Sequence, residues 1–85
     1  MNNYEIAEHF SLLAKLIDIH GENSFKSKSY SIAAFNIEKL AEQLNELKAE
    51  EIYALKGIGE ATGKKIIEIL ETGNLKTLEG YLEKT

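Results

Sequence analysis

The stretch that decides the fold is residues 51–70, which read EIYALKGIGEATGKKIIEIL. Two glycines, Gly57 and Gly59, enclose the single apolar residue Ile58. Because glycine permits a tight turn and leaves the backbone bare, the pattern predicts two helices joined by a short hairpin over about residues 49–70. Ile58 would point inward and fix the turn to the core. The amide groups that open the second helix would attract a phosphate, so the hairpin can hold a nucleic-acid backbone without reading bases.

The chain outside this stretch also has helical spacing, and no segment alternates at period two for long enough to predict a strand. Proline is absent, so no internal position forbids a helix. We expect helices near residues 3–20, 25–44, 49–55, 60–70 and 75–82. The predicted fold class is therefore all-α, a bundle of four to five short helices that forms one domain over residues 1–85.

Caps and apolar stripes support these helices. Gly21 is placed to end the first helix in a left-handed cap, and Asn23 or Ser24 to begin the second. Apolar residues recur at helical intervals in the first helix, and the expected buried stripe of the second is Tyr30, Ala33, Ala34, Ile37, Leu40, Ala41 and Leu44. Phe25 and Phe35 are also predicted to lie in the core.

Length and composition exclude several classes of protein. Eighty-five residues are too few for a polymerase, a kinase or another large catalytic fold. The absence of cysteine excludes disulfide scaffolds, zinc fingers and thiol nucleophiles. No apolar run approaches the roughly 18 residues of a membrane span, and the N-terminus lacks the basic region of a signal peptide. We expect a cytoplasmic monomer without a membrane partner.

The charge is unevenly distributed. The net charge is −4, and all ten cations are lysine. Residues 26–41 and residues 56–66 nevertheless each carry a net charge of +2, from Lys26, Lys28 and Lys39 in the first segment and Lys56, Lys64 and Lys65 in the second. If these two basic segments meet in space, they form a local surface for a polyanion within an acidic protein.

The hairpin resembles the helix-hairpin-helix motif, and the resemblance continues on both sides of it. The supporting residues are Ile6-Ala7, Phe10, Leu13-Ala14, Gly21-Glu22-Asn23, Phe25-Lys26, Ser29-Tyr30, Ala33-Ala34, Ile37-Glu38, Thr72-Gly73, Leu75 and Leu78-Glu79. Over about residues 5–80 the chain is similar to the N-terminal domain of bacterial family X DNA polymerases, which is related to the small lyase domain of DNA polymerase beta. The resemblance implies a repair domain, as in base excision repair, that binds gapped DNA and its 5′-phosphate independently of sequence. The nucleotidyl-transfer domains of that family are absent, so polymerase activity does not reside here.

The same resemblance implies roles for individual residues. Lys65 matches the lysine that forms a Schiff base with an abasic sugar, and Lys26 and Tyr30 match the 5′-phosphate pocket. The DNA-binding surface would also include Lys56, Gly57, Ile58, Gly59 and Lys64. The backbone carbonyls of Tyr53, Leu55 and Ile58 match those that bind a monovalent cation, Na⁺ or K⁺, and the lyase chemistry requires no cofactor.

The spacing around Lys65 agrees with that role. On a helix, Lys64 has Glu60 and Glu68 four residues away on either side, which is a good pairing arrangement. Lys65 has Ala61 and Ile69 at those positions, so it would lie at the edge of the apolar face. Desolvation there can lower an amine's pKa, as a Schiff-base lysine needs.

Three functions stay open at the level of sequence. The first is a DNA-binding domain, either part of a longer polymerase or a small stand-alone relative. The second is a lyase that acts on 5′-deoxyribose phosphate. The third is a helical protein-interaction module that has lost DNA binding, which the acidic net charge favours.

Overall fold

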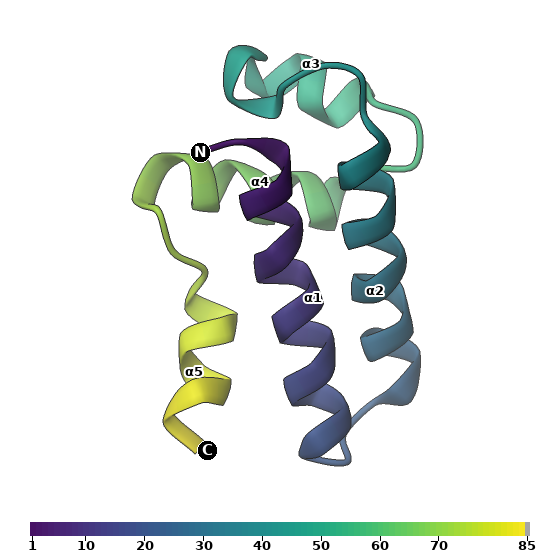
Figure 1. Cartoon of the computed structure of the whole chain (residues 1–85), viewed down its shortest axis with the longest axis vertical. Helices are drawn as coiled ribbons and strands as arrows, with labels where there is room; N and C mark the ends of the chain where they lie inside the picture. Colours follow the sequence, from purple (N-terminus) through teal and green to yellow (C-terminus); the bar gives the residue numbers. More distant parts are fainter. Residues whose placement is uncertain (85) are drawn as a thin grey trace.

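The computed structural model describes residues 1–84 and, within them, consists of helices without a strand. The elements are α1 (Asn3–Ile19), α2 (Ser24–Lys39), the short 3-10 helix η1 (Leu44–Glu46), α3 (Ala49–Ala54), α4 (Glu60–Thr72) and α5 (Lys76–Lys84). Figure 1 shows α1 and α2 as an antiparallel pair, with α4 running across their upper ends, α3 above it and α5 along the other side of α1. The predicted all-α class is confirmed.

The predicted helix ends are confirmed where a cap specifies them. The Asn23 side chain accepts the backbone N–H groups of Phe25 and Lys26, so Asn23 is the N-cap of α2. Gly21 and Gly73, which follow α1 and α4, have φ angles of +67° and +80°. Left-handed backbone of this kind ends a helix and favours glycine.

The predicted end of the second helix is wrong. α2 stops at Lys39, and the chain turns before Leu44 enters η1. Asn3, which is buried, holds this turn: its Oδ1 accepts the Leu44 N–H at 2.8 Å and its Nδ2 donates to the Glu42 carbonyl at 2.7 Å. Leu44 is therefore fully buried although it lies outside α2, whereas Ala41, expected in the buried stripe, is exposed.

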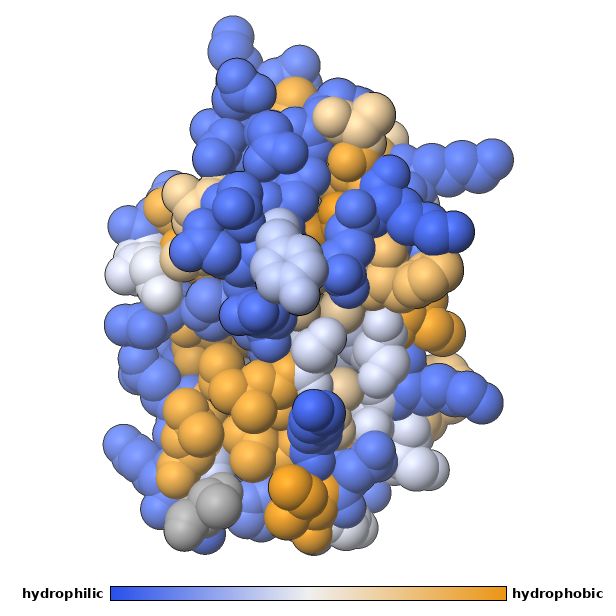
Figure 2. All heavy atoms as spheres, viewed as in Figure 1, coloured by the Kyte–Doolittle hydropathy of each residue, from blue (hydrophilic) through white to orange (hydrophobic). Residues whose placement is uncertain are grey.

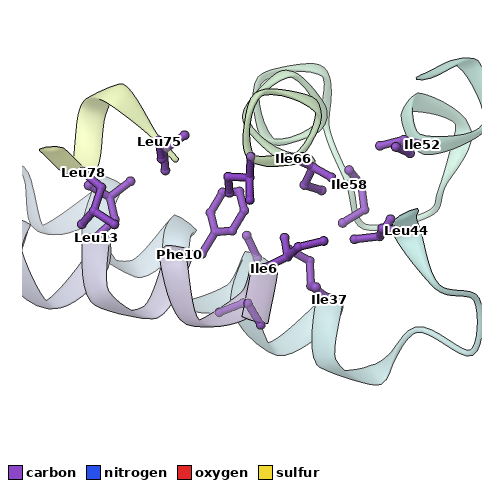
Figure 3. Close-up of a cluster of buried hydrophobic side chains, with 14 of the residues drawn as sticks. Ile6, Phe10, Leu13, Ile37, Leu44, Ile52, Ile58, Ile66, Leu75 and Leu78 are labelled. Carbon is purple, nitrogen blue, oxygen red and sulfur yellow. The ribbon is translucent and has the colours of Figure 1, made fainter. Parts of the chain in front are cut away.

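The core lies between α1, α2 and α4 and is almost entirely aliphatic. Figure 3 shows Ile58 and Ile66 facing Ile37 and Leu44 across the centre of the molecule, with Phe10 farther along α1. Tyr30 is half-buried, and its ring centroid lies 6.1 Å from that of Phe10.

The prediction that Phe25 and Phe35 belong to the core is wrong, because they are 78% and 56% exposed. The core side of α2 carries the small residues Ala33 and Ala34 together with Ile37. Small side chains let α1 and α2 approach closely, and the two phenylalanines lie on the opposite side of the helix.

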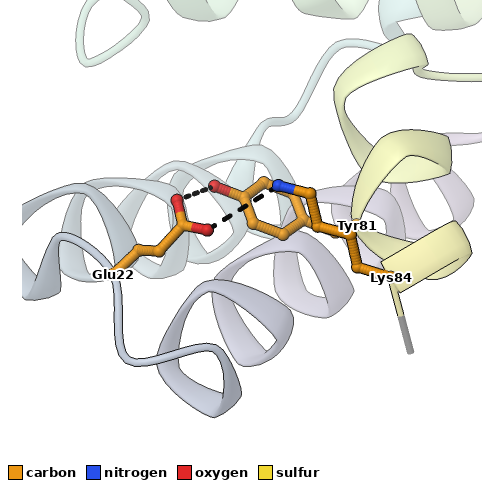
Figure 4. A network of polar contacts seen from close by, with 3 residues as sticks. All are labelled: Glu22, Tyr81 and Lys84. Atoms are coloured by element: carbon orange, nitrogen blue, oxygen red, sulfur yellow. Dashed lines mark hydrogen bonds and ion pairs between the residues drawn. The ribbon is translucent and has the colours of Figure 1, made fainter.

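Helix α5 is fastened to the loop between α1 and α2 (Figure 4). The Tyr81 hydroxyl donates to Glu22 Oε1 at 2.8 Å, and Lys84 Nζ lies 3.9 Å from Glu22 Oε2. The hydrogen bond to Glu22, with smaller contributions from partial burial and the Glu22 charge, raises the pKa of the Tyr81 hydroxyl above its usual value.

None of the helices within residues 1–84 combines the length and the hydrophobicity that a bilayer crossing needs.

Candidate nucleic-acid interface

The hairpin between α3 and α4 is a four-residue turn from Leu55 to Ile58. The Ile58 N–H donates to the Leu55 carbonyl at 3.2 Å, and Gly57, the third residue, has a φ of +87°. A turn with positive φ at its third residue favours glycine there. Ile58 is 4% exposed, as predicted, and fixes the turn to the core. Gly59 has an ordinary φ of −78°, so the backbone requires glycine at position 57 and not at position 59.

Two contacts that the sequence does not predict hold the hairpin in place. Asn36 of α2 donates from Nδ2 to the Gly57 carbonyl at 3.4 Å. The Tyr53 ring lies against Gly63, where an added Cβ would stand 2.8 Å from its Cδ1 and 2.9 Å from its Cε1. A glycine inside a helical pattern is a signal of such close packing, so Gly63 could have been found. Nothing in the sequence marks Asn36.

The N-terminus of α4 follows directly after the turn. Its N-cap is Gly59, whose missing side chain leaves the first-turn amides of α4 without a side-chain cap. These amides carry the positive end of the helix dipole and are suited to an anion. Glu60, the first residue of α4, is exposed and places a carboxylate beside them. This carboxylate opposes a phosphate, so the site is weaker than its backbone alone would make it.

Lys65 and Tyr30 come together between α4 and α2. Lys65 is half-buried, and its Nζ lies 5.9 Å from the centroid of the Tyr30 ring, within the range of a cation–π contact. Lys26 is exposed one turn before Tyr30 and lies on the same side of α2, about 40° around the helix. A hydroxyl and two amines from two separate helices thus gather on one side of the molecule.

The other two lysines of the first basic segment do not join this group. Lys28 and Lys39 are displaced from Tyr30 by about 160° and 180° around α2. Lys39 Nζ lies instead 4.4 Å from the centroid of the Phe35 ring. The structure therefore divides the first basic segment between two sides of α2.

The expected pairing of Lys64 with Glu60 and Glu68 is wrong. Within residues 1–84, neither carboxylate lies at ion-pair distance from the Lys64 amine. Glu68 Oε2 accepts the backbone N–H of Lys76 at 2.7 Å and so caps α5. Lys64 is exposed in the second turn of α4, and Lys56 is exposed in the turn that precedes α4.

The carbonyls of Tyr53, Leu55 and Ile58 remain the predicted ligands of a monovalent cation. The last carbonyls of a short helix have no intrahelical partner, which applies to Tyr53 in α3. The Leu55 carbonyl accepts one N–H, from Ile58, and retains a second lone pair. Hard oxygen donors of this kind fit Na⁺ or K⁺, so the residues present are compatible with such an ion.

Comparison with known proteins places this geometry in a family. Residues 1–75 match the sequence model of the helix-hairpin-helix domain, a range that includes the hairpin and both helices that carry Tyr30 and Lys65. No curated protein sequence matches the chain. Since the match covers most of the chain, this protein belongs to the helix-hairpin-helix domain family, whose members commonly bind DNA.

Proposed function

We propose that the domain binds DNA without reading its sequence, through a face made of the hairpin, the N-terminus of α4 and the Tyr30 side of α2. The observation that carries the proposal is the turn itself: Gly57 has a positive φ, Ile58 is buried, and the first-turn amides of α4 have no side-chain cap. Exposed lysines precede and follow these amides in the chain, at Lys56 and Lys64. Backbone amides and lysines contact phosphates and carry no sequence information.

We further propose that this face prefers a gap with a 5′-phosphate. Lys26, Tyr30 and Lys65 offer two cations and a hydroxyl donor: Lys65 Nζ lies 5.9 Å from the centroid of the Tyr30 ring, and Lys26 lies one turn before Tyr30 on α2. A terminal phosphate carries more charge and more free oxygens than an internal one, so it gains most from such a group. The similarity to family X polymerase N-terminal domains supports the same preference. A Na⁺ or K⁺ ion held by the carbonyls of Tyr53, Leu55 and Ile58 would add positive charge to this face.

The lyase activity is a proposal of its own, and Lys65 carries it. The neutral amine would attack the C1′ aldehyde of a 5′-deoxyribose phosphate, and water would leave as the imine forms. Loss of a C2′ proton to solvent would then break the C3′–O bond and free the DNA strand. Hydrolysis of the imine would return the lysine and release the unsaturated sugar phosphate. The partial burial of Lys65, in contrast with the exposed Lys64, supports this choice of nucleophile.

Titration of labelled duplexes tests the binding proposal. We expect a 5′-phosphorylated gap to bind more tightly than an intact duplex. If Lys26, Lys56, Lys64 and Lys65 each meet a phosphate, affinity should fall about a hundred-fold between about 50 and 200 mM salt. Lys65→Ala should weaken binding and reduce the salt slope by about one unit, whereas Lys15→Ala, which changes an exposed lysine of α1, should change neither. Salt-independent binding, or equal effects of the two substitutions, would defeat the proposal.

Borohydride trapping tests the lyase separately. Wild type and Lys64→Ala should each form a covalent adduct with a 5′-deoxyribose-phosphate substrate, and Lys65→Ala should lose most of it. If Lys65→Ala traps as well as Lys64→Ala, the lyase assignment is wrong and plain DNA binding remains.

A further inference from the structure

The outer side of α2 carries a regular stripe of apolar and basic residues. We use the term outer stripe for Phe25, Lys28, Ile32, Phe35 and Lys39, whose intervals are three, four, three and four residues. The three apolar members are between 55% and 78% exposed. In Figure 2, the edge of the molecule that α2 forms shows apolar atoms between extended hydrophilic side chains.

The outer stripe is separate from the proposed DNA-binding face. Ile32 lies about 160° around α2 from Tyr30, and Lys39 lies about 180° from it. Tyr30 lies in the middle of the side of α2 that packs on α1, among Ala33, Ala34 and Ile37, so the outer stripe is on the opposite side of the helix. A ligand on the outer stripe can therefore bind while DNA occupies the hairpin.

The spacing of the outer stripe matches a helix as its partner. Single exposed apolar residues are normal, but three of them at alternating three- and four-residue intervals form one continuous seam. From Phe25 to Lys39 the seam is about 21 Å long, at about 1.5 Å per residue. A helix with apolar residues on two opposite sides is usually packed against other elements on both sides. In this structure α2 packs on α1 through one side, and the side that carries the outer stripe is exposed.

The charge of the outer stripe selects among possible occupants. It contains two lysines, and α2 has no acidic residue before Glu38. A second copy of α2 would add two further lysines to the interface and would offer no carboxylate before its own Glu38. The stripe is poorly suited to single-stranded nucleic acid, because bases stack on aromatic rings. Ile32 at its centre is aliphatic, and the Lys39 amine already lies over the Phe35 ring. We propose that the outer stripe docks an acidic amphipathic helix of a partner protein, with apolar residues in the seam and carboxylates facing Lys28 and Lys39.

Two synthetic peptides provide the test. One is a 16-residue helical peptide (about four turns) with leucines at alternating three- and four-residue intervals and glutamates beside them. The other has lysine in place of every glutamate. With the ¹⁵N-labelled domain, the acidic peptide should shift the resonances of the outer stripe and bind at least about ten-fold more tightly than the basic one.

Substitutions on this exposed surface should change binding without unfolding the domain, which circular dichroism checks. Phe35→Ser and Ile32→Ser should each lower the affinity for the acidic peptide at least about ten-fold. The double variant Lys28→Glu/Lys39→Glu should bind the basic peptide more tightly than the acidic one. Lys15→Glu, on α1, is the matched control and should leave the preference unchanged.

The proposal is overturned if the acidic peptide does not bind, if both peptides bind equally, or if an oligothymidine displaces the acidic peptide. A dimer in sedimentation that Phe35→Ser dissociates would assign the outer stripe to a second copy and would also overturn it. Failure here is distinguishable from failure of the DNA proposal, because Phe35→Ser should retain gap binding and Lys65→Ala should retain peptide binding.

Discussion

Gly57→Ser should destabilise the domain through the backbone of the hairpin. At a φ of +87°, a Cβ approaches the following carbonyl oxygen, which costs about 1–2 kcal/mol. The added Cβ would also stand 3.2 Å from Asn36 Nδ2, the atom that donates to the Gly57 carbonyl. A loss of about 1–2 kcal/mol lowers the melting temperature of a domain of this size by about 4–16 °C.

Gly59→Ser is the matched control, with the same side chain two residues later. Gly59 has a φ of −78°, and nothing lies within 4 Å of an added Cβ, so no strain is expected. At an N-cap, serine and glycine differ by only a few tenths of a kcal/mol. Serine would, however, cap the α4 amides, so DNA affinity should fall while stability stays constant. Urea and thermal unfolding of both variants give the comparison, and equal losses of stability at the two positions would refute the reasoning.

Three further predictions concern the surroundings of the hairpin and of α5. Gly63→Ala should lower the free energy of unfolding by about 1–2 kcal/mol, because the Tyr53 ring occupies the space of the added Cβ. In a double-mutant cycle, Tyr53→Ala should then cost about 1 kcal/mol less in the Gly63→Ala variant than in wild type. Glu60→Gln should raise DNA affinity about two- to five-fold at low salt and slightly reduce stability, since it removes a carboxylate from the N-terminus of α4; unchanged affinity would exclude that terminus from the interface. The raised pKa of Tyr81 means that its hydrogen bond to Glu22 stabilises the fold below the unfolded pKa, near 10, and is lost as pH rises through the folded pKa. The melting temperature of wild type should therefore fall more steeply above about pH 10 than that of Tyr81→Phe.

The sequence predicts the helices and the hairpin because short-range chemistry specifies them. Gly21 and Gly57 tolerate the left-handed backbone that a helix end and a tight turn need, Asn23 caps a helix, and Ile58 is apolar between two glycines. The early end of α2 was not predictable in this way. It depends on Asn3, which binds the 42–44 turn from a position 39 to 41 residues earlier in the chain, and periodicity contains no information about such a contact.

The candidate site was predicted in part for the same reason. Lys65 contacts the Tyr30 ring, and helical spacing places Lys26 one turn before Tyr30. The Schiff-base and phosphate-binding roles that the family resemblance implies for these residues stay predictions. The supports from Asn36 and Tyr53 act between elements distant in sequence. Phe25 and Phe35 were predicted to be buried because they are large and apolar, yet close packing of α2 on α1 uses the small alanines instead.

The footprint of DNA on the ¹⁵N-labelled domain tests the central claim most directly. On titration with a 5′-phosphorylated gapped duplex, the account predicts that the largest shifts occur in residues 56–65 and 26–30, with small shifts in α5 and at Phe35. An intact duplex should shift residues 56–65 and leave residues 26–30 nearly unchanged. Largest shifts in α1, in α5 or along the outer stripe would contradict the claim that the hairpin and the Tyr30 side of α2 form the DNA-binding face.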